Sequence, residues 1–299
     1  MAWLQLKLNA SDQQSEQIED ALLEAGALSV SFHDRYDNPI LEPAPGETPL
    51  WPDMVLTALF EESADASAIE SSLFETLGDI MPSCEWEVLE DKVWEREWLQ
   101  HFEPIAFGNT LWVCPSEHQV PSDGRVVMHL DPGLAFGTGT HPTTALCLAW
   151  LAENPPQGGV IDYGCGSGIL SIGALLLGAE HAWAVDIDQQ ALSATWDNAE
   201  RNGVAGNQLT IGLPESLGQL PPQPLLVANI LAGPLIELAP QLAKLVRVDG
   251  QAVLSGILNE QADGVIAAWS DAFSPLEVKQ QGDWCRIVLR RKPDGSGPV

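Results

Sequence analysis

The residues whose types and spacing point most directly to chemistry lie in V-I-D-Y-G-C-G-S-G, residues 160–168, and in an acid that follows them. Gly164, Gly166 and Gly168 allow the backbone to turn sharply and to approach a ligand closely. Asp186 lies 18 residues after the last of these glycines. An acid at about this distance from a glycine-rich turn accepts hydrogen bonds from the hydroxyls of a bound ribose. The pattern therefore predicts a nucleoside-binding site.

The segments around the glycines are typical of a strand, a turn, a helix and a second strand. Val160 and Ile161 are apolar and β-branched, as residues of a buried parallel strand are. Residues 169–178 (I-L-S-I-G-A-L-L-L-G) continue as an apolar helix, and residues 181–188 form the next strand. Asp186 is then expected at the carboxyl end of that strand, where open α/β sheets bind their ligands.

The spacing within the glycine run distinguishes two kinds of nucleotide site. Dinucleotide-binding turns have the spacing G-x-G-x-x-G. This run is G-C-G-S-G, and Asp162 precedes it at the end of the strand. D-x-G-x-G-x-G resembles motif I of the class I methyltransferases, which bind S-adenosylmethionine rather than NAD. The alternative is a glycine-rich turn in some other α/β enzyme.

A second segment rich in glycine and hydroxyl groups occupies residues 131–144 (D-P-G-L-A-F-G-T-G-T-H-P-T-T). We expect a helix to begin near Thr143, and the free N–H groups of a helix start bind polar or anionic groups. From there Thr144 is predicted to reach the methionyl carboxylate or the ribose of a cofactor. The alternative, which the segment taken alone favours, is that Thr143 and Thr144 only belong to the helix N-cap.

A third segment, residues 227–234 (V-A-N-I-L-A-G-P), ends the fourth predicted strand of the sheet. Asn is depleted in strands, so Asn229 at this position favours a functional role. Its side-chain oxygen can accept N–H bonds from an amine and align the nitrogen lone pair with the cofactor methyl. We therefore predict Asn229 as a catalytic and cofactor-binding residue. Many amino-group methyltransferases have N-P-P-Y or D-P-P-Y here, and N-I-L-A without the aromatic ring suggests a wider pocket.

The remaining reactive side chains are predicted to be structural. His141 and Asp131 lie in the glycine-rich segment, but a structural role is favoured over proton transfer for both. Cys165 lies inside the cofactor turn, and we interpret it as a small packing residue. The five cysteines are scattered and contain no C-x-x-C pair, which indicates reduced thiols and predicts neither disulfides nor a metal site.

The charge of the chain limits its partners. The net charge is −29 over 299 residues, and residues 1–120 carry 24 acidic and 4 basic residues, a net charge of −20. Such a surface repels phosphate backbones, so no direct contact with nucleic acid is expected. A basic protein would be attracted to it at long range. The chain has no secretory signal and no apolar run near the roughly 18 residues of a membrane span, so no membrane association is expected.

The order of predicted elements indicates two domains. Residues 1–90 read β-α-β-β-α-β, a ferredoxin-like α+β order. Its first helix is expected over residues 11–25, with Ile18, Leu22 and Leu23 on one face. The strands are expected at residues 3–8, 28–33, 54–60 and 84–89, and the second helix at residues 65–77. We expect a linker helix at residues 91–102, with Trp94 and Trp98 on one face.

The rest of the chain, residues 103–292, is predicted to be the α/β catalytic domain. Short strands are expected at residues 105–107, 111–114 and 126–130. Seven further strands are expected at residues 160–164, 181–186, 208–212, 224–230, 250–256, 275–280 and 284–290. The last two would pair antiparallel through a turn at residues 281–283, which gives the Rossmann-like, seven-stranded class I methyltransferase sheet. Residues 293–299 are expected to be a disordered tail.

Taken together, the three site segments and A-V-D-I-D-Q-Q-A-L with D-N-A-E-R-N-G-V (residues 184–192 and 197–204) resemble the ribosomal protein L-eleven methyltransferases of the PrmA type. The acidic first domain and the W-E-R-E-W linker are similar to that family as well. The resemblance implies a cytoplasmic bacterial enzyme, which we expect to be a monomer. It would transfer methyl groups from S-adenosylmethionine to lysine ε-amines and the α-amine of one basic ribosomal protein, which the mobile first domain would recognise.

The family's cofactor-binding positions correspond here to Thr144, Gly164, Asp186 and Asn229, to which motif I adds Asp162 and Gly166. Two other functions remain open. One is a class I methyltransferase with a different acceptor, although the charge disfavours RNA and the missing N-P-P-Y disfavours glutamine. The other is a non-catalytic module that binds basic proteins, which the intact site residues disfavour.

Overall fold

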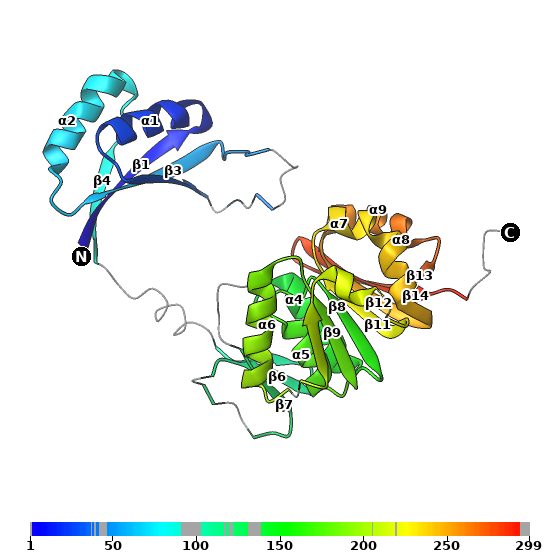
Figure 1. Cartoon of the computed structure of the whole chain (residues 1–299). Coiled ribbons are helices and arrows are strands. Elements are labelled where there is room, and N and C mark those ends of the chain that lie inside the picture. The colour runs from blue at the N-terminus through cyan, green and yellow to red at the C-terminus, as the bar shows by residue number, and fades with distance from the viewer. Residues whose placement is uncertain are drawn as a thin grey trace. The chain divides into compact units, whose positions relative to one another are not determined.

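The computed structural model describes residues 2–36, 38, 40–41, 47–90, 103–116, 118–119, 122–130, 139–204, 206–218 and 220–293. The chain divides into two compact units, Met1–Trp94 and Glu95–Val299 (Figure 1). The linker helix predicted at residues 91–102 lies outside the described residues, and so do residues 294–299 of the tail predicted at residues 293–299.

The first unit is a four-stranded antiparallel sheet with two helices on one face (Figure 1). Its strands lie in the order β2-β3-β1-β4. The chain runs β-α-β-β-α-β, so the predicted order of elements is confirmed. The bounds are β1 Ala2–Ser11, α1 Asp12–Glu24, β2 Ser29–Asp34, β3 Asp53–Glu61, α2 Ala66–Leu77, a 3₁₀ turn Gly78–Ile80, and β4 Cys84–Glu90.

Local capping and an apolar stripe explain the two helices of this unit. Ser11 caps α1 together with Gln14, and the Asp65 carboxylate accepts backbone N–H bonds at the start of α2. Ile18 and Leu22 are fully buried, as predicted, because residues four apart share a helix face. The prediction for Leu23 is wrong. Its side chain is 47% exposed, since a residue five positions after Ile18 has rotated off that face.

The second unit contains a seven-stranded mixed sheet in the order β10-β9-β8-β11-β12-β14-β13. The first five strands in this order are parallel, and β14 pairs antiparallel with both β12 and β13, which confirms the predicted hairpin. The bounds are β8 Gly159–Tyr163, β9 His181–Val185, β10 Leu209–Gly212, β11 Gln223–Asn229, β12 Val246–Leu258, β13 Phe273–Gln281 and β14 Trp284–Arg291. The chain order reverses between β8 and β11, which is where such sheets bind ligands.

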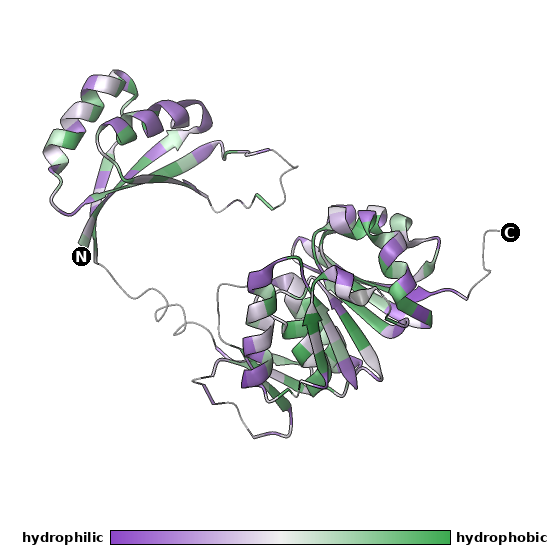
Figure 2. Ribbon diagram, viewed as in Figure 1, coloured by the Kyte–Doolittle hydropathy of each residue, from purple (hydrophilic) through white to green (hydrophobic). Residues whose placement is uncertain are grey.

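Helices cover both faces of this sheet (Figure 1). One face packs α4 Pro142–Glu153, α5 Ile169–Leu176 and α6 Gln189–Arg201, and the other packs α7 Ala232–Glu237, α8 Ala239–Leu242 and α9 Ala262–Trp269. Consecutive strand residues alternate between the two cores. Leu225 and Val227 pack on the first face, and Leu226 packs on the second. Figure 2 shows the central strands as strongly hydrophobic, as expected for strands buried on both faces.

Shorter elements complete the unit. A three-stranded sheet of β5 Ile105–Phe107, β6 Leu111–Cys114 and β7 Val126–His129 lies where three short strands were predicted. Further 3₁₀ turns span Pro214–Leu217, Ala243–Leu245 and Asn259–Gln261. Within the described ranges, no helix is long and apolar enough to cross a membrane.

Candidate active site

The glycine turn after β8 has a backbone that requires glycine. Gly164, Gly166 and Gly168 have φ angles of +79°, +53° and +78°, in the region that side chains with a Cβ disfavour. A Cβ on Gly164 would lie 2.2 Å from Cγ2 of Ile230, just after β11. A Cβ on Gly168 would lie 2.7 Å from Cγ2 of Thr195 on α6. The turn is therefore packed closely against two neighbouring elements.

Asp186 directly follows β9 and faces this turn. Its Oδ2 accepts a hydrogen bond from the backbone N–H of Gly166 at 2.9 Å, and its Oδ1 accepts one from the N–H of Asp188 at 3.0 Å. Each carboxylate oxygen has a second lone pair available. Because the side chain is only half-buried, those lone pairs can accept hydroxyl groups of a ligand. The structure thus brings together Asp186 and Gly166, as the sequence predicts.

Asp162 is positioned differently from Asp186. It is completely buried, and its Oδ2 accepts hydrogen bonds from the Ser171 N–H at 2.9 Å and the Ser171 hydroxyl at 2.5 Å. Its Oδ1 has no hydrogen-bond partner among the described residues. Asp162 therefore anchors the first turn of α5 behind the glycine turn. The sequence reasoning missed Ser171, whose only signal was a hydroxyl within an otherwise apolar helix.

Burial of the Asp162 carboxyl raises its pKa from 3.8 to about 6, against the lowering effect of the two Ser171 hydrogen bonds. Between these values the folded protein binds a proton that the unfolded chain does not, so stability falls as pH rises from about 4 to about 6. We expect this loss to be about 3 kcal/mol, at 1.36 kcal/mol per pKa unit. Asp162→Asn should lack it, so the difference in unfolding free energy between the two proteins should change over this range.

Calorimetric unfolding of both proteins between pH 4 and pH 7 measures that difference. All other titrating groups are the same in the two proteins, so their contributions cancel. A difference that stays constant across the range would mean that the Asp162 pKa is not raised.

Thr144 and Asn229, predicted from separate segments, meet in the structure. The Asn229 amide donates a hydrogen bond to Oγ1 of Thr144 at 3.1 Å, which joins the end of β11 to the first turn of α4. Thr144 is buried, with 3% of its surface exposed, and Asn229 is half-buried. His141, rather than either threonine, is the N-cap residue of α4, and its Nδ1 accepts from the Thr143 N–H. The first-turn position of Thr144 is therefore not explained by capping.

The other reactive groups of the site are held in structural contacts. The His141 ring packs edge-on against Trp284, with ring centroids 5.1 Å apart, and burial lowers the pKa of its imidazole. At neutral pH this imidazole is uncharged. Cys165 is buried, its Sγ lies 3.4 Å from Oγ1 of Thr195, and burial raises its thiol pKa. A neutral, buried thiol agrees with the packing role predicted for Cys165. Asp131 lies outside the described residues.

These groups occupy the carboxyl ends of three adjacent strands. Asp186 follows β9, the glycine turn follows β8, and Asn229 ends β11, and the three strands are neighbours in the order β9-β8-β11. Neighbouring strands lie about 4.8 Å apart, so the groups span about 10 Å along the sheet edge. A half-buried carboxylate at one end and an amide with a hydroxyl at the other suit an elongated ligand that joins a nucleoside to an amino acid. The residues present fit S-adenosylmethionine.

Comparison with known proteins identifies the family of the chain. The family model described as ribosomal protein L11 methyltransferase (PrmA) matches residues 2–292. The chain belongs to this family. The ribosomal protein L11 methyltransferase of Pseudomonas savastanoi pv. phaseolicola is 52% identical over 293 residues, which cover 98% of this chain and all of that protein. The one from Azotobacter vinelandii is 51% identical, covering 96% of this chain and 98% of that protein.

A solved structure also resembles the chain. The ribosomal protein L11 methylase of Lactobacillus delbrueckii subsp. bulgaricus is 32% identical, with a TM-score of 0.58. The match covers 64% of this chain and all of that structure.

In this member of the ribosomal protein L11 methyltransferase family, two residues of α6 contact the glycine turn and were missed at the sequence level. Thr195 and Asn198 each donate a side-chain hydrogen bond to a carbonyl of the turn. Their signal was a pair of polar residues three apart on one helix face, which a sequence alone does not distinguish from a solvated face.

Proposed function

We propose that this protein transfers methyl groups from S-adenosylmethionine to the lysine ε-amines and the N-terminal α-amine of ribosomal protein L11. Family membership over residues 2–292 supports the reaction. The observation that carries the proposal is the convergence of Asp186, the glycine turn and the Thr144–Asn229 pair on one sheet edge. The seven-stranded sheet is then a class I methyltransferase sheet.

Each part of the site has a distinct task in cofactor binding. S-adenosylmethionine, when bound, supplies an electrophilic methyl group on a positively charged sulfur. Asp186 accepts the ribose hydroxyls, and its two backbone hydrogen bonds fix the direction of its carboxylate. Gly164 and Gly166 give the backbone the positive φ angles of the turn, which let it approach the ligand closely. The Thr144 hydroxyl binds the methionyl end.

Asn229 positions the attacking amine. Its Nδ2 donates to Thr144, which leaves Oδ1 as an acceptor without a partner among the described residues. An amine that donates an N–H to this oxygen has its lone pair directed along a fixed line, and alignment of two reactants in this way accelerates reactions strongly. No acid or base is needed at the moment of methyl transfer if the amine arrives neutral.

Neutrality of the amine is the main energetic demand on the substrate. A free lysine has a pKa near 10.4, so deprotonation at pH 7 costs roughly 4.6 kcal/mol. Partial desolvation of the ammonium lowers that pKa, and so does a nearby positive charge. The half-buried position of Asn229 provides the desolvation, and the sulfonium of bound S-adenosylmethionine would supply the positive charge.

We assign recognition of the protein substrate to the first unit, as a ferredoxin-like domain. Residues 1–120, which contain this unit and the start of the next, carry a net charge of −20, which attracts a basic protein at long range. In the described part of this unit the basic side chains are Lys7 and Arg35. Lys7 is paired with Glu87 at 2.7 Å, and Arg35 lies over the ring of Tyr36. The basic side chains in the described part of this unit therefore neutralise few of its acidic charges.

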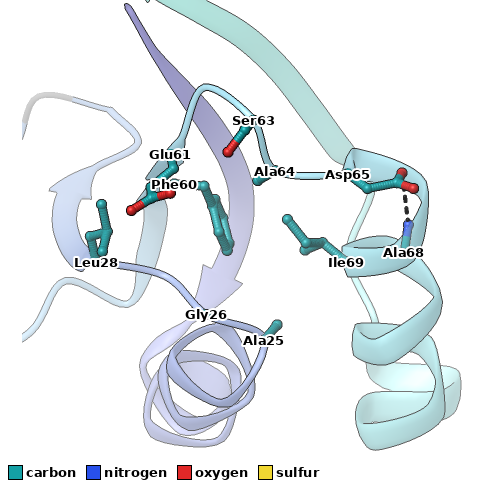
Figure 3. Close-up of a pocket in the computed structure, with 10 residues that line it drawn as sticks. All are labelled: Ala25, Gly26, Leu28, Phe60, Glu61, Ser63, Ala64, Asp65, Ala68 and Ile69. Carbon is teal, nitrogen blue, oxygen red and sulfur yellow. Dashed lines mark hydrogen bonds between the residues drawn. The ribbon is translucent and has the colours of Figure 1, made fainter. Parts of the chain in front are cut away.

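A pocket of about 320 Å³ in this unit suits a basic side chain (Figure 3). It opens between α1 and α2 at the end of β3, with Phe60 and Ile69 as apolar walls and Glu61 at its side. None of its lining residues is basic, and the Asp65 carboxylate is occupied in capping α2. A lysine or arginine can bury its apolar stem in such a site while its charge meets a carboxylate. We place a substrate contact there.

The remaining assignments concern location, oligomeric state and contact with nucleic acid. A protein that modifies a ribosomal protein acts in the cytoplasm, and we propose that it acts as a monomer without direct contact to nucleic acid.

Replacing Asp186 by alanine is expected to weaken S-adenosylmethionine binding by about 1.5–3 kcal/mol, because charge-assisted hydrogen bonds to the ribose are lost. Calorimetric titration of both proteins measures the change in Kd. Asp271→Ala is the matched control, since that exposed carboxylate lies between α9 and β13, outside the site. Equal affinities for the wild type and Asp186→Ala would remove Asp186 from the cofactor site.

The acceptor is tested by incubating the protein with a mixture of ribosomal proteins and S-adenosylmethionine labelled in the methyl group. We expect the label to appear in the single band of ribosomal protein L11. Label in other ribosomal proteins and not in L11 would show that the acceptor is assigned wrongly.

A further inference from the structure

One face of α6 carries buried polar side chains that neither the sequence analysis nor the proposed reaction accounts for. Thr195 is completely buried, and Asn198 is 6% exposed. Residues three apart lie on the same side of a helix, so both point in one direction. Buried polar groups need hydrogen-bond partners, and the identity of those partners shows what the face is for.

The partners are two consecutive carbonyls of the glycine turn. The Thr195 hydroxyl donates to the Gly166 carbonyl at 3.0 Å, and the Asn198 amide donates to the Ser167 carbonyl at 2.9 Å. The methyl group of Thr195 also packs where a Cβ on Gly168 would stand. Helix α6 therefore holds the turn by these two hydrogen bonds, by the contact of Thr195 with the Cys165 thiol at 3.4 Å and by one steric contact.

Gly166 is held from both sides. Its N–H donates to the Asp186 carboxylate at 2.9 Å, and its carbonyl accepts from Thr195. A glycine with a φ of +53° has wide conformational freedom, so the turn needs external contacts to stay in one conformation. Because Asp186 is also the proposed ribose acceptor, a shift of Gly166 would alter the orientation of the carboxylate that binds the ligand.

The same helix also holds the strand that leads into the glycine-rich segment. Asn202, at the end of α6, accepts from the His129 N–H and donates to the His129 carbonyl, both at 2.7 Å. The Asn202 side chain thus satisfies the backbone N–H and C=O of His129, as a neighbouring strand would at the end of β7. Helix α6 therefore holds both the glycine turn and the end of β7.

We propose that Thr195 and Asn198 are positioning residues of the cofactor site, which act on S-adenosylmethionine through the carbonyls of Gly166 and Ser167. This inference rests on the proposed use of S-adenosylmethionine. The two residues do not touch the cofactor. They fix the turn in its binding conformation before the cofactor arrives. The free energy of binding is then not reduced by the entropic cost of ordering the turn.

Thr195→Val and Thr195→Ser separate the hydroxyl from the methyl group. Valine keeps the packing against Gly168 and loses the hydrogen bond to Gly166, whereas serine does the reverse. We expect Thr195→Val to raise the Kd for S-adenosylmethionine about tenfold and Thr195→Ser to stay closer to the wild type. Turnover at saturating cofactor and the KM for ribosomal protein L11 should change less than twofold in Thr195→Val. Ser193→Ala, an exposed hydroxyl on the same helix, is the control and should leave all values unchanged.

Calorimetric titration gives the Kd values, and thermal unfolding reports stability. Wild-type affinity in Thr195→Val would overturn the inference. So would equal weakening in both variants in proportion to a lower melting temperature, which indicates packing alone. A wild-type protein that does not bind S-adenosylmethionine would instead overturn the proposed function, and the inference with it.

Discussion

Replacing Asn229 by alanine should reduce the turnover of ribosomal protein L11 methylation by about 100-fold at saturating S-adenosylmethionine. The Asn229 oxygen is the proposed acceptor for the amine, and loss of alignment at a reacting centre has effects of about this size. The melting temperature should fall by only a few degrees, because the variant loses one neutral hydrogen bond of about 1 kcal/mol, to Thr144. Steady-state kinetics and thermal unfolding of the same preparations check both values.

Thr144→Val is the matched control for this variant. It removes the same hydrogen bond from the opposite side and leaves the Asn229 amide in place. Thr144→Val should mainly raise the KM for S-adenosylmethionine and retain most of the turnover at saturation. Near wild-type turnover in Asn229→Ala would show that the end of β11 is not the acceptor site.

Removing residues 2–90 should abolish methylation of intact ribosomal protein L11 and leave S-adenosylmethionine binding within a few-fold of wild type. The proposed cofactor-binding residues all lie in the second unit, and among the described residues its seven-stranded sheet and two cores contain none of the first unit. Encounter with a basic substrate depends on the deleted acidic surface. Calorimetric titration and a methylation assay on the full chain and the truncated protein test this division of labour.

Salt and a pair of single variants refine the same test in the full chain. The KM for ribosomal protein L11 should rise with added salt, because charges separated by more than about 8 Å are screened at physiological ionic strength. Glu61→Gln should raise it further than Glu62→Gln, which removes the same charge from an adjacent, exposed residue that does not line the pocket. Full methylation by the truncated protein would show that the first unit does not recognise the substrate.

The sequence predicted the elements well where a periodic pattern determines them. Alternation in β1 and β4 and the apolar runs of β8 and β11 place the strands within a few residues. The prediction was weaker where the pattern is interrupted. β12 begins at Val246 rather than at residue 250, because the strand continues through Asp249 and Gly250, a pair that usually marks a turn. The prediction that Leu23 lies on the apolar face of α1 was wrong, because the spacing of apolar residues overestimated the width of that face.

The site was predictable to the extent that topology alone brings residues together. Parallel strands place their carboxyl ends at one edge, so Asp186, the glycine turn and Asn229 were expected to converge. Hydrogen bonds between distant side chains were not predictable. The Asn229–Thr144 bond joins residues 85 apart, and the bonds from α6 to the turn join residues 29 and 31 apart. No sequence period encodes such pairs. The same holds for the Ser171 hydroxyl, which appears as an exception in an apolar helix until its contact with Asp162 is seen.

The most direct test of the account is mass spectrometry of purified ribosomal protein L11 after incubation with the full-length protein and S-adenosylmethionine. We predict mass increments of whole methyl groups, with fragment ions that place them on lysine ε-amines and on the N-terminal α-amine. Asn229→Ala, in parallel, should give almost none in the same time. Unmodified ribosomal protein L11 after incubation with wild-type protein that demonstrably binds S-adenosylmethionine would contradict the account.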